Sequence, residues 1–416
     1  MSQNDLQPLT LDVIRTAISG TAAAFRCVTK YQPAGGPSEK VFPPTYAGGK
    51  YATEERRIDG AVVPCVLLDS VQSQANRMEE TLLQAYDAGQ LRFPLMVVDF
   101  SRTEDDSVQN DPEVARIGRI STLDAPHRIA DAIFRDSVLN NETTIRQFRE
   151  SREGQAYENA NIRNATALLE LCPTALIFGT WDSTSLGRRS PGNKFARVLV
   201  SEIVGVNATL GVRTSSRIDP LDISSQARIF DDGQGDWTLE NTGTLYGRSS
   251  RTPGRPSLIV HGNVTPDVSE SGGVTIDYAL QTTVLSLAGL RRLRFPGQNG
   301  QLIAERNVAA RTVLTTLALI AMVSHCGMSC DLRSRCLLMP TESSQAIELV
   351  TSGADCQSFA LTVALGVELF TQAVQMARAA GFTWQEDALV LRPMNKLVGL
   401  IQESRRAAMQ AEGEGA

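Results

Sequence analysis

Apolar residues recur every three or four positions in two early segments, residues 11–20 and residues 69–89. This spacing places them on one face of a helix, so the sequence predicts two amphipathic helices. At the start of the second segment, Asp69 and Gln72 have the spacing of an N-cap and of the residue that completes a capping box. Gly89 lies just past the end of the same helix, where glycine commonly terminates helices.

Apolar runs with many β-branched residues predict strands. They comprise residues 61–69, 94–100, 174–181, 195–208, 256–264 and 273–287. The order strand, helix, strand and then further strands is typical of an α+β fold. We therefore expect an RRM-like (ferredoxin-like) palm sheet with its helices on one face, elaborated by helical and hairpin insertions.

Three segments differ from this pattern. Residues 101–170 are charged and predict a mostly helical insertion, and residues 341–416 predict a C-terminal helical region with a frayed tail. Residues 213–256 are rich in Gly, Ser, Asp and Arg. A polar connection of this length is uncommon in a compact domain unless it has a function. We expect one domain, residues 1–416, that includes all three segments.

Composition narrows the possible functions. The chain has 416 residues, of which 42% are hydrophobic, and this excludes a disordered protein, a coiled coil or a collagen-like fibre. Forty basic and 46 acidic side chains give a net charge of −6. The chain as a whole is therefore not a general polyanion binder, and any nucleic-acid site must be a local basic patch.

The N-terminal residues and the cysteines indicate the compartment. The first ten residues have neither a basic nor an apolar region of the kind that makes a secretory signal. The longest apolar stretch, residues 313–323, is shorter than the roughly 20 residues that span a bilayer. Seven scattered cysteines, an odd number, are typical of reduced thiols. We expect a cytoplasmic protein.

The first candidate binding surface is the start of the second helix. Ser70, Gln72, Ser73, Asn76 and Arg77 bring hydroxyls, amides and one guanidinium to the positive end of the helix dipole. Such a surface can hold a phosphate or a nucleotide edge without a metal. The alternative is the solvated polar side of an ordinary amphipathic helix.

The second candidate is the loop of residues 40–57. Lys40, Lys50 and Arg56 alternate there with aromatic side chains. Cations follow the backbone of an unpaired strand while ring faces accept its bases. The pair Gly48–Gly49 allows a ligand to approach the backbone closely. The alternative is a surface loop whose aromatic rings pack against the core.

The third candidate is the basic segment 183–201, which contains no acidic residue. Its cations are Arg188, Arg189, Lys194 and Arg197. Two further acid-free basic runs follow, at residues 248–255 and 291–294. Each run alone is also compatible with a solvated surface patch. Three such runs in a chain of negative net charge favour binding to phosphates.

Signs of catalysis are weaker. No carboxylates have a recognised metal-ligand spacing, and there is no nucleophile elbow, Walker A loop or dinucleotide fingerprint. His325 and the nearby cysteines Cys326, Cys330 and Cys336 lack the paired CxxC of structural zinc sites, so we expect buried thiols there. The sequence predicts a binding protein with no catalytic residues, metal or cofactor. Acidic clusters beside basic runs keep a metal-dependent ribonuclease open as the alternative.

Five segments carry a resemblance to a known family. They are residues 40–57, 66–80, 125–137, 173–183 and 195–205. They resemble the CRISPR RAMP protein of type I-U, also called I-G, which is the Cas-seven-type backbone subunit of Cascade. The segments occur in the order expected for that family, and the string DSVQSQANR is far more specific than a glycine motif.

The resemblance implies a non-catalytic subunit that oligomerises along CRISPR RNA and presents it for pairing with target DNA in antiviral defence. It implies further partners: more copies of the chain, a fused Cas-five/Cas-six-type subunit and a large subunit, with no membrane. Residues 213–256 would then be a thumb-like hairpin. Phosphate contacts are predicted for Lys50, Arg77, Arg188, Arg189 and Lys194. Sugar or phosphate oxygens would be oriented by Ser70, Gln72, Ser73 and Asn76. A scaffold whose arginines serve only protein contacts is a further alternative.

Overall fold

The computed structural model describes residues 6–102, 111–141, 144–182, 193–248, 250, 252–269, 272–297, 299–326, 330–341, 346–351 and 356–415. The chain divides into two compact units, in contrast to the single domain expected. The first comprises residues 1–208 and 276–397, and the second comprises residues 209–275 and 398–416. The division arises because the segment 209–275 makes its strand pairs within itself.

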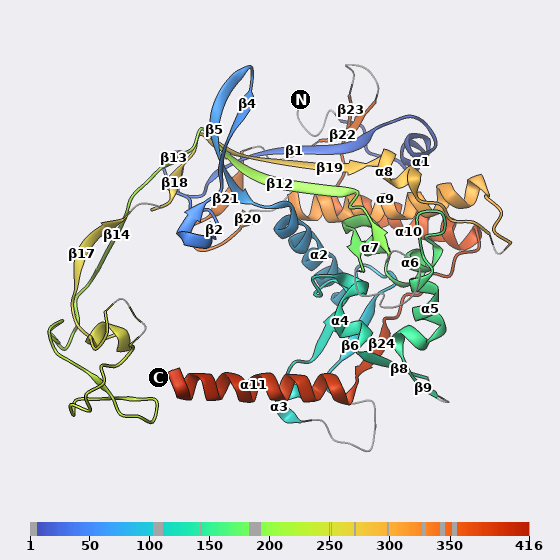
Figure 1. Cartoon of the computed structure of the whole chain (residues 1–416). Coiled ribbons are helices and arrows are strands. Elements are labelled where there is room, and N and C mark those ends of the chain that lie inside the picture. The colour runs from blue at the N-terminus through green and yellow to red at the C-terminus, as the bar shows by residue number, and fades with distance from the viewer. Residues whose placement is uncertain are drawn as a thin grey trace. The chain divides into compact units, whose positions relative to one another are not determined.

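The first unit is built on an antiparallel sheet (Figure 1). Its main strands are β1 (Ala24–Pro33), β4 (Thr53–Ile58), β5 (Ala61–Asp69), β12 (Leu199–Val206), β19 (Tyr278–Ser286), β20 (Cys330–Asp331) and β21 (Leu337–Pro340). They lie in the order β20-β21-β1-β19-β12-β5-β4. β22 (Ile347–Val350) also pairs with β1, and β23 (Gln357–Phe359) pairs with β22. The predicted α+β class is confirmed.

The central strand β1 is absent from the sequence prediction. Phe25, Cys27 and Tyr31 are buried on one side of β1, and the alternate positions include the polar residues Arg26 and Lys30. This alternation is the pattern of a half-buried strand. A search for continuous apolar runs overlooks it because every second residue faces away from the core.

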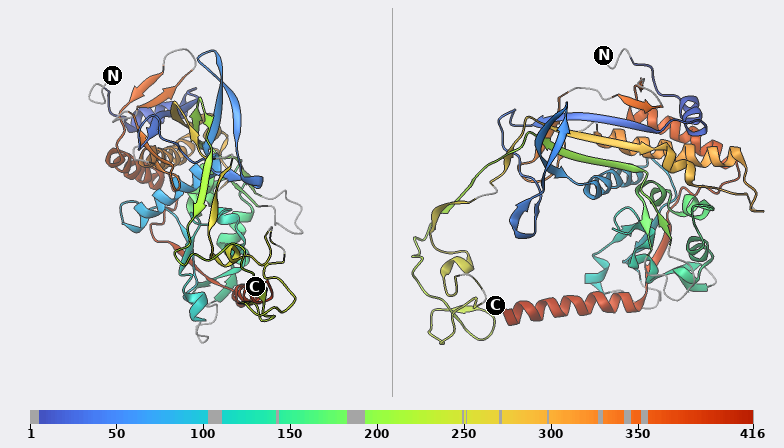
Figure 2. Two further views of the ribbon diagram at one scale, coloured as in Figure 1. Left: turned by 90° about the vertical axis from the view of Figure 1, so that its left-hand side faces the viewer. Right: turned by 45° about the horizontal axis from the view of Figure 1, so that its top comes forward.

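Helices cover one side of this sheet (Figure 2). α2 (Val71–Asp87) contacts β12, and α9 (Ala304–Cys326) contacts α2, β1 and β19. α1 (Leu11–Ser19) and α10 (Val363–Ala379) pack on α9. Both helices predicted near the N-terminus are present.

Helix α9 is more apolar than the sequence pattern suggested. Within the described residues it is the one helix long and apolar enough to cross a membrane, but 78% of its most apolar window is buried inside the protein. Its contacts with α1, α2, α10 and the sheet account for this composition.

A second sheet forms within the same unit. Its strands, in spatial order, are β7 (Arg119–Ser121), β6 (Met96–Asp99), β24 (Leu389–Pro393), β8 (Ser137–Asn141) and β9 (Thr144–Gln147). Short helices accompany them: α3 (Pro112–Ala115), α4 (Ala132–Arg135), α5 (Arg152–Glu158) and α6 (Thr166–Leu171). The segment 101–170 is thus not mostly helical. Its strand β8 pairs with β24, a partner more than 240 residues away along the chain, and β7 pairs with β6, which local patterns do not reveal.

Two predicted strands are wrong. Residues 174–181 fold largely as α7 (Pro173–Phe178), which starts with a proline and ends before Gly179 at φ 82°. All residues of α7 are buried, and a short apolar run in a buried helix looks the same as one in a buried strand. Residues 256–264 form a 3₁₀ turn, Pro256–Ile259, and only their last residue enters β17 (Val264–Ser269).

The second unit contains an antiparallel ribbon. β13 (Thr209–Leu210) pairs with β18 (Val274–Thr275), and β14 (Arg213–Arg217) pairs with β17. Between them, β15 (Phe230–Asp231) pairs with β16 (Trp237–Thr238). The predicted hairpin of residues 213–256 is therefore part of a longer ribbon. The predicted frayed tail belongs instead to α11 (Asn395–Gly415).

Candidate nucleic-acid interface

The first candidate surface, the start of α2, is capped by Ser70. Its Oγ accepts a hydrogen bond from the backbone N–H of Ser73 at 3.3 Å. The predicted capping box of Asp69 and Gln72 is wrong, because Asp69 is the last residue of β5 and its side chain is 1% exposed. The Asp69 carboxylate therefore binds partners inside the protein instead of capping the helix.

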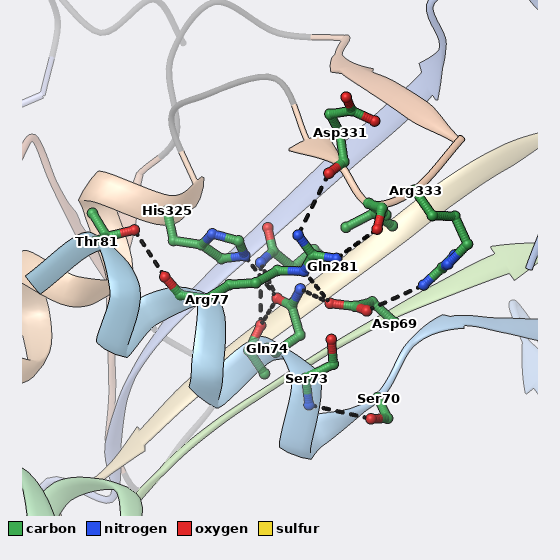
Figure 3. Close-up of polar contacts among 12 residues, drawn as sticks. Asp69, Ser70, Ser73, Gln74, Arg77, Thr81, Gln281, His325, Asp331 and Arg333 are labelled. Carbon is green, nitrogen blue, oxygen red and sulfur yellow. Dashed lines mark hydrogen bonds and ion pairs between the residues drawn. The ribbon is translucent and has the colours of Figure 1, made fainter. Parts of the chain in front are cut away.

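Asp69 is the centre of a buried polar network (Figure 3). Gln74 Nε2 donates to Asp69 Oδ2 at 2.6 Å, and Arg77 Nε donates to the same oxygen at 3.0 Å. Arg333 Nη2 lies 3.4 Å from Asp69 Oδ1. A buried carboxylate is tolerated only where hydrogen bonds and opposite charges compensate its lost hydration. These three side chains provide that compensation.

Gln74 connects this carboxylate to the sheet and to α9. Its Oε1 accepts hydrogen bonds from Ser201 Oγ at 2.9 Å and from Gln281 Nε2 at 2.8 Å. His325 Nε2 lies 3.0 Å from the same oxygen. Burial lowers the pKa of His325 to about 4, so the ring is neutral near pH 7 and Nε2 is the protonated nitrogen that donates. The start of α2 is thereby fixed against β12, β19 and α9.

Two of the predicted binding cations have internal partners. Besides Asp69, Arg77 donates from Nη2 to the Leu332 carbonyl at 2.7 Å. Arg56 forms ion pairs with Glu54 at 2.5 Å and with Glu202 at 2.8 Å, and the hydrogen bond that it donates to Glu202 raises its pKa. These two guanidinium groups bind other parts of the same chain and hold strands and helices in place. The prediction was that they contact phosphates.

The second candidate surface meets the first through Arg333. Arg333 Nη1 donates to the Phe42 carbonyl at 3.3 Å while its Nη2 faces Asp69. Arg335 lies 4.4 Å from the centre of the Phe42 ring. The loop that contains Lys40 and Lys50 is therefore anchored beside the start of α2.

The tip of this loop is a small hairpin. β2 (Thr45–Tyr46) pairs with β3 (Lys50–Tyr51) across Gly48 and Gly49, both of which have positive φ. Such backbone angles are easy for glycine and costly for other residues. Tyr46 and Lys50 are exposed there, and Lys40 is half-buried.

The third candidate surface meets the first through Arg197. Its Nη1 donates to the Val71 carbonyl and its Nε to the Phe178 carbonyl, both at 3.0 Å. Burial and the neighbouring Arg128 guanidinium lower the pKa of Arg197. The Arg197 guanidinium therefore lies beside the first turn of α2, and its hydrogen bonds to the two carbonyls fix its position.

Lys194 remains exposed in β11 (Lys194–Phe195), with its Nζ 5.5 Å from the ring centre of Trp181. Arg188 and Arg189 lie outside the described residues. On α2, Gln72 and Asn76 are exposed and Ser73 is half-buried. The predicted residues that face solvent are thus Lys50, Gln72, Asn76 and Lys194.

Sequence reasoning missed the residues that hold this region together. Arg128 forms a bidentate pair with Glu79, with both distances 2.6 Å, and burial raises the pKa of Glu79. Glu79 and Glu80 are adjacent in sequence, but only Glu80 faces solvent. Residue type does not distinguish the two carboxylates. The helical phase of Glu79, one position after the buried Met78, is the only available clue.

The imagined zinc site is not formed by the described residues. Among them, no three His, Cys, Asp or Glu side chains lie close enough together to hold a metal ion. His325 is hydrogen-bonded to Gln74, and burial raises the pKa of the Cys330 and Cys336 thiols.

Comparison with known families now decides the family of this region. Residues 25–210 match the family model described as CRISPR-associated protein GSU0053 (Cas_GSU0053). The family that this segment matches is a CRISPR-associated family of the Cas7 type. The segment includes nearly all of β1, the loop of residues 40–57, α2 and the basic segment that contains Arg197, so the resemblance noted in the sequence is confirmed. No curated protein matches the chain.

Proposed function

We propose that this CRISPR-associated protein is a non-catalytic backbone subunit that binds CRISPR RNA, oligomerises along it and presents it for pairing with target DNA. The observation that carries this proposal is the meeting of three polar segments at the start of α2. Arg333 joins the loop of residues 40–57 to Asp69, and Arg197 joins the basic strand to Val71. Exposed cations, amides and rings from distant parts of the chain thus share one region of the first unit.

The order of the strands supports an RRM-like palm. Along the chain the elements run β1, α2, β12, β19, α9 and β21, and in space the strands run β21-β1-β19-β12. This is a βαββαβ arrangement with both helices on one face, extended at the β12 edge by the β5–β4 hairpin. Such sheets recur in proteins that bind single-stranded RNA.

The proposed partners follow from the same role. Further copies of the chain would line the guide, and the ends of the assembly would meet a fused Cas-five/Cas-six-type subunit and a large subunit. In such assemblies base pairing reads the target sequence, while the protein holds backbone and shape. A net charge of −6 fits a protein whose phosphate contacts are confined to local patches. We place the assembly in the cytoplasm, where guide RNA is available.

Binding of single-stranded RNA to the purified protein tests the proposal. Affinity should rise with strand length as further copies join, and it should fall with salt because neutralised phosphates release counterions. The double variant Lys50→Ala and Lys194→Ala should weaken binding of all sequences similarly. Its salt slope should be lower by about one unit for each lost phosphate contact.

The matched control removes two exposed cations elsewhere in the first unit, Arg116 and Arg163. This double alanine variant has the same change in net charge, so it should bind RNA as the unchanged protein does. If both double variants weaken binding equally, general charge rather than the region around α2 attracts the RNA. If the unchanged protein binds no strand of any length, the proposed function is wrong.

A further inference from the structure

Trp181 is unusual among the aromatic residues of the first unit. It is 63% exposed, whereas Trp384, by comparison, is 5% exposed. A tryptophan in water leaves a large apolar ring without a partner, so exposed tryptophans commonly mark binding surfaces. Trp181 belongs to β10 (Thr180–Trp181), which pairs with β11.

The backbone that carries Trp181 is rigidly held. Thr180 and Phe195, which are opposite each other in the ladder, are both buried. The next residue, Asp182, is 3% exposed, and its carboxylate accepts hydrogen bonds from Arg149 Nη2 at 2.7 Å and from the Tyr157 hydroxyl at 3.3 Å.

The opposite strand, β11, is fixed to the same residues, Asp182 and Tyr157. Asp182 N–H donates to the Asn193 carbonyl at 2.9 Å, and the Asn193 side-chain amide donates to the Tyr157 carbonyl. The hairpin stem is thus clamped on both strands. A backbone held in this way limits the conformational entropy that is lost when a ligand stacks on the ring.

The charged groups around the Trp181 ring indicate which class of ligand it can bind. Lys194, opposite Trp181 in the ladder, places its ammonium 5.5 Å from the ring centre. Within the described part of the chain no carboxylate lies within ion-pairing distance of Lys194. Asp182, which follows Trp181 in the sequence, is buried and paired with Arg149. An apolar ring beside a cation without an acidic partner suits a base joined to a phosphate.

We infer that Trp181 stacks on one unpaired base of a bound RNA strand while Lys194 contacts the adjoining phosphate. This inference rests on the proposed function and adds a base-stacking residue to it. The binding of any base at this position follows, because stacking uses the ring face that all bases share.

The experiment compares Trp181→Ala with the unchanged protein on two strands of equal length, single-stranded RNA and a strand of abasic spacers. The abasic strand keeps the phosphates and lacks the bases. Trp181→Ala should bind RNA about tenfold more weakly, the size expected for one lost stacking contact. It should bind the abasic strand as well as the unchanged protein does. Trp181→Phe, which keeps a smaller ring, should recover part of the loss.

Fluorescence gives a second measurement on the same proteins. RNA should quench the emission of the unchanged protein, and Trp181→Phe should lose most of that quenching. Trp384→Phe, which removes a buried tryptophan of the first unit, is the control and should keep the quenching.

Three results would overturn the inference. If Trp181→Ala binds RNA unchanged, or loses affinity equally for RNA and the abasic strand, then Trp181 does not stack on a base. If it leaves RNA binding intact and instead disrupts association between copies, then the exposed ring serves a protein contact. In each case the proposed function stands as long as the unchanged protein binds RNA. Absence of all strand binding overturns both.

Discussion

The start of α2 and the β10–β11 hairpin contain similar polar residue types but use them in opposite ways. At α2, Arg77, Gln74 and Asp69 satisfy one another, so the guanidinium is committed to the fold. On the hairpin, Lys194 and Trp181 face solvent above a buried stem. The difference teaches that burial and partners, rather than residue type, separate side chains that hold the fold from side chains that stay open to a ligand.

The largest effect on stability is expected from breaking the buried network at the start of α2. Asp69→Asn removes the negative charge between Arg77 and Arg333, which leaves two partly buried guanidinium groups without their carboxylate. The free energy of unfolding, measured with urea, should fall by about 3 kcal/mol, as for other broken buried pairs. Asp331→Ala, which alters an exposed carboxylate in β20, should change stability by less than about 0.5 kcal/mol. Equal losses in the two variants would contradict the internal role of Asp69.

The next effect concerns pH. The pKa of His325 is lowered to about 4 from an ordinary value of 6.5, so between these values the unfolded chain binds a proton that the folded protein does not. Stability therefore falls as pH falls through this window. Between pH 7 and pH 5 the unchanged protein should lose about 2 kcal/mol relative to His325→Gln, which has no such titration. His127→Gln, at an exposed histidine, is the control substitution.

The smallest effect on stability is expected from changing the exposed residues of the β10–β11 hairpin. Lys194→Ala should change the free energy of unfolding by less than about 0.5 kcal/mol, because the side chain is exposed. It should nevertheless reduce the salt dependence of RNA binding. Arg77→Ala should do the reverse, destabilising the fold by about 2 kcal/mol through the lost charged hydrogen bonds without lowering the salt slope of the protein that remains folded. Exchange of these two outcomes would mean that the roles of Arg77 and Lys194 have been assigned the wrong way round.

The reaction chemistry can be tested with the same preparations. Incubation of labelled RNA with the protein and Mn²⁺ should yield no defined products. Specific cuts that EDTA abolishes would favour the ribonuclease alternative and contradict a purely binding role.

Much of the fold could be predicted from local pattern. The helices at residues 11–20 and 69–89 and the strands at 61–69, 195–208 and 273–287 have strong periodicity or long apolar runs, and all are present. β1 is absent from the sequence prediction because polar and apolar residues alternate along it. Residues 174–181 were taken for a strand because a buried helix and a buried strand share the same apolar composition.

The candidate site was predictable only in outline. Hydrogen bonds of Arg333 and Arg197 link the loop of residues 40–57 and the basic segment to the start of α2. Which polar groups face solvent could not be predicted, because that depends on contacts made far along the chain. Arg333 and His325 approach α2 from more than 240 positions away, and no local signal marks Arg77 as their neighbour.

Photo-crosslinking of 4-thiouridine-substituted RNA to the protein, followed by mapping of the attached peptides, tests the central claim most directly. The account predicts crosslinks on peptides from residues 40–51, 71–77 and 181–197 together, with fewer on the last when Trp181 is alanine. Crosslinks that avoid all three segments and fall on other surfaces would contradict it.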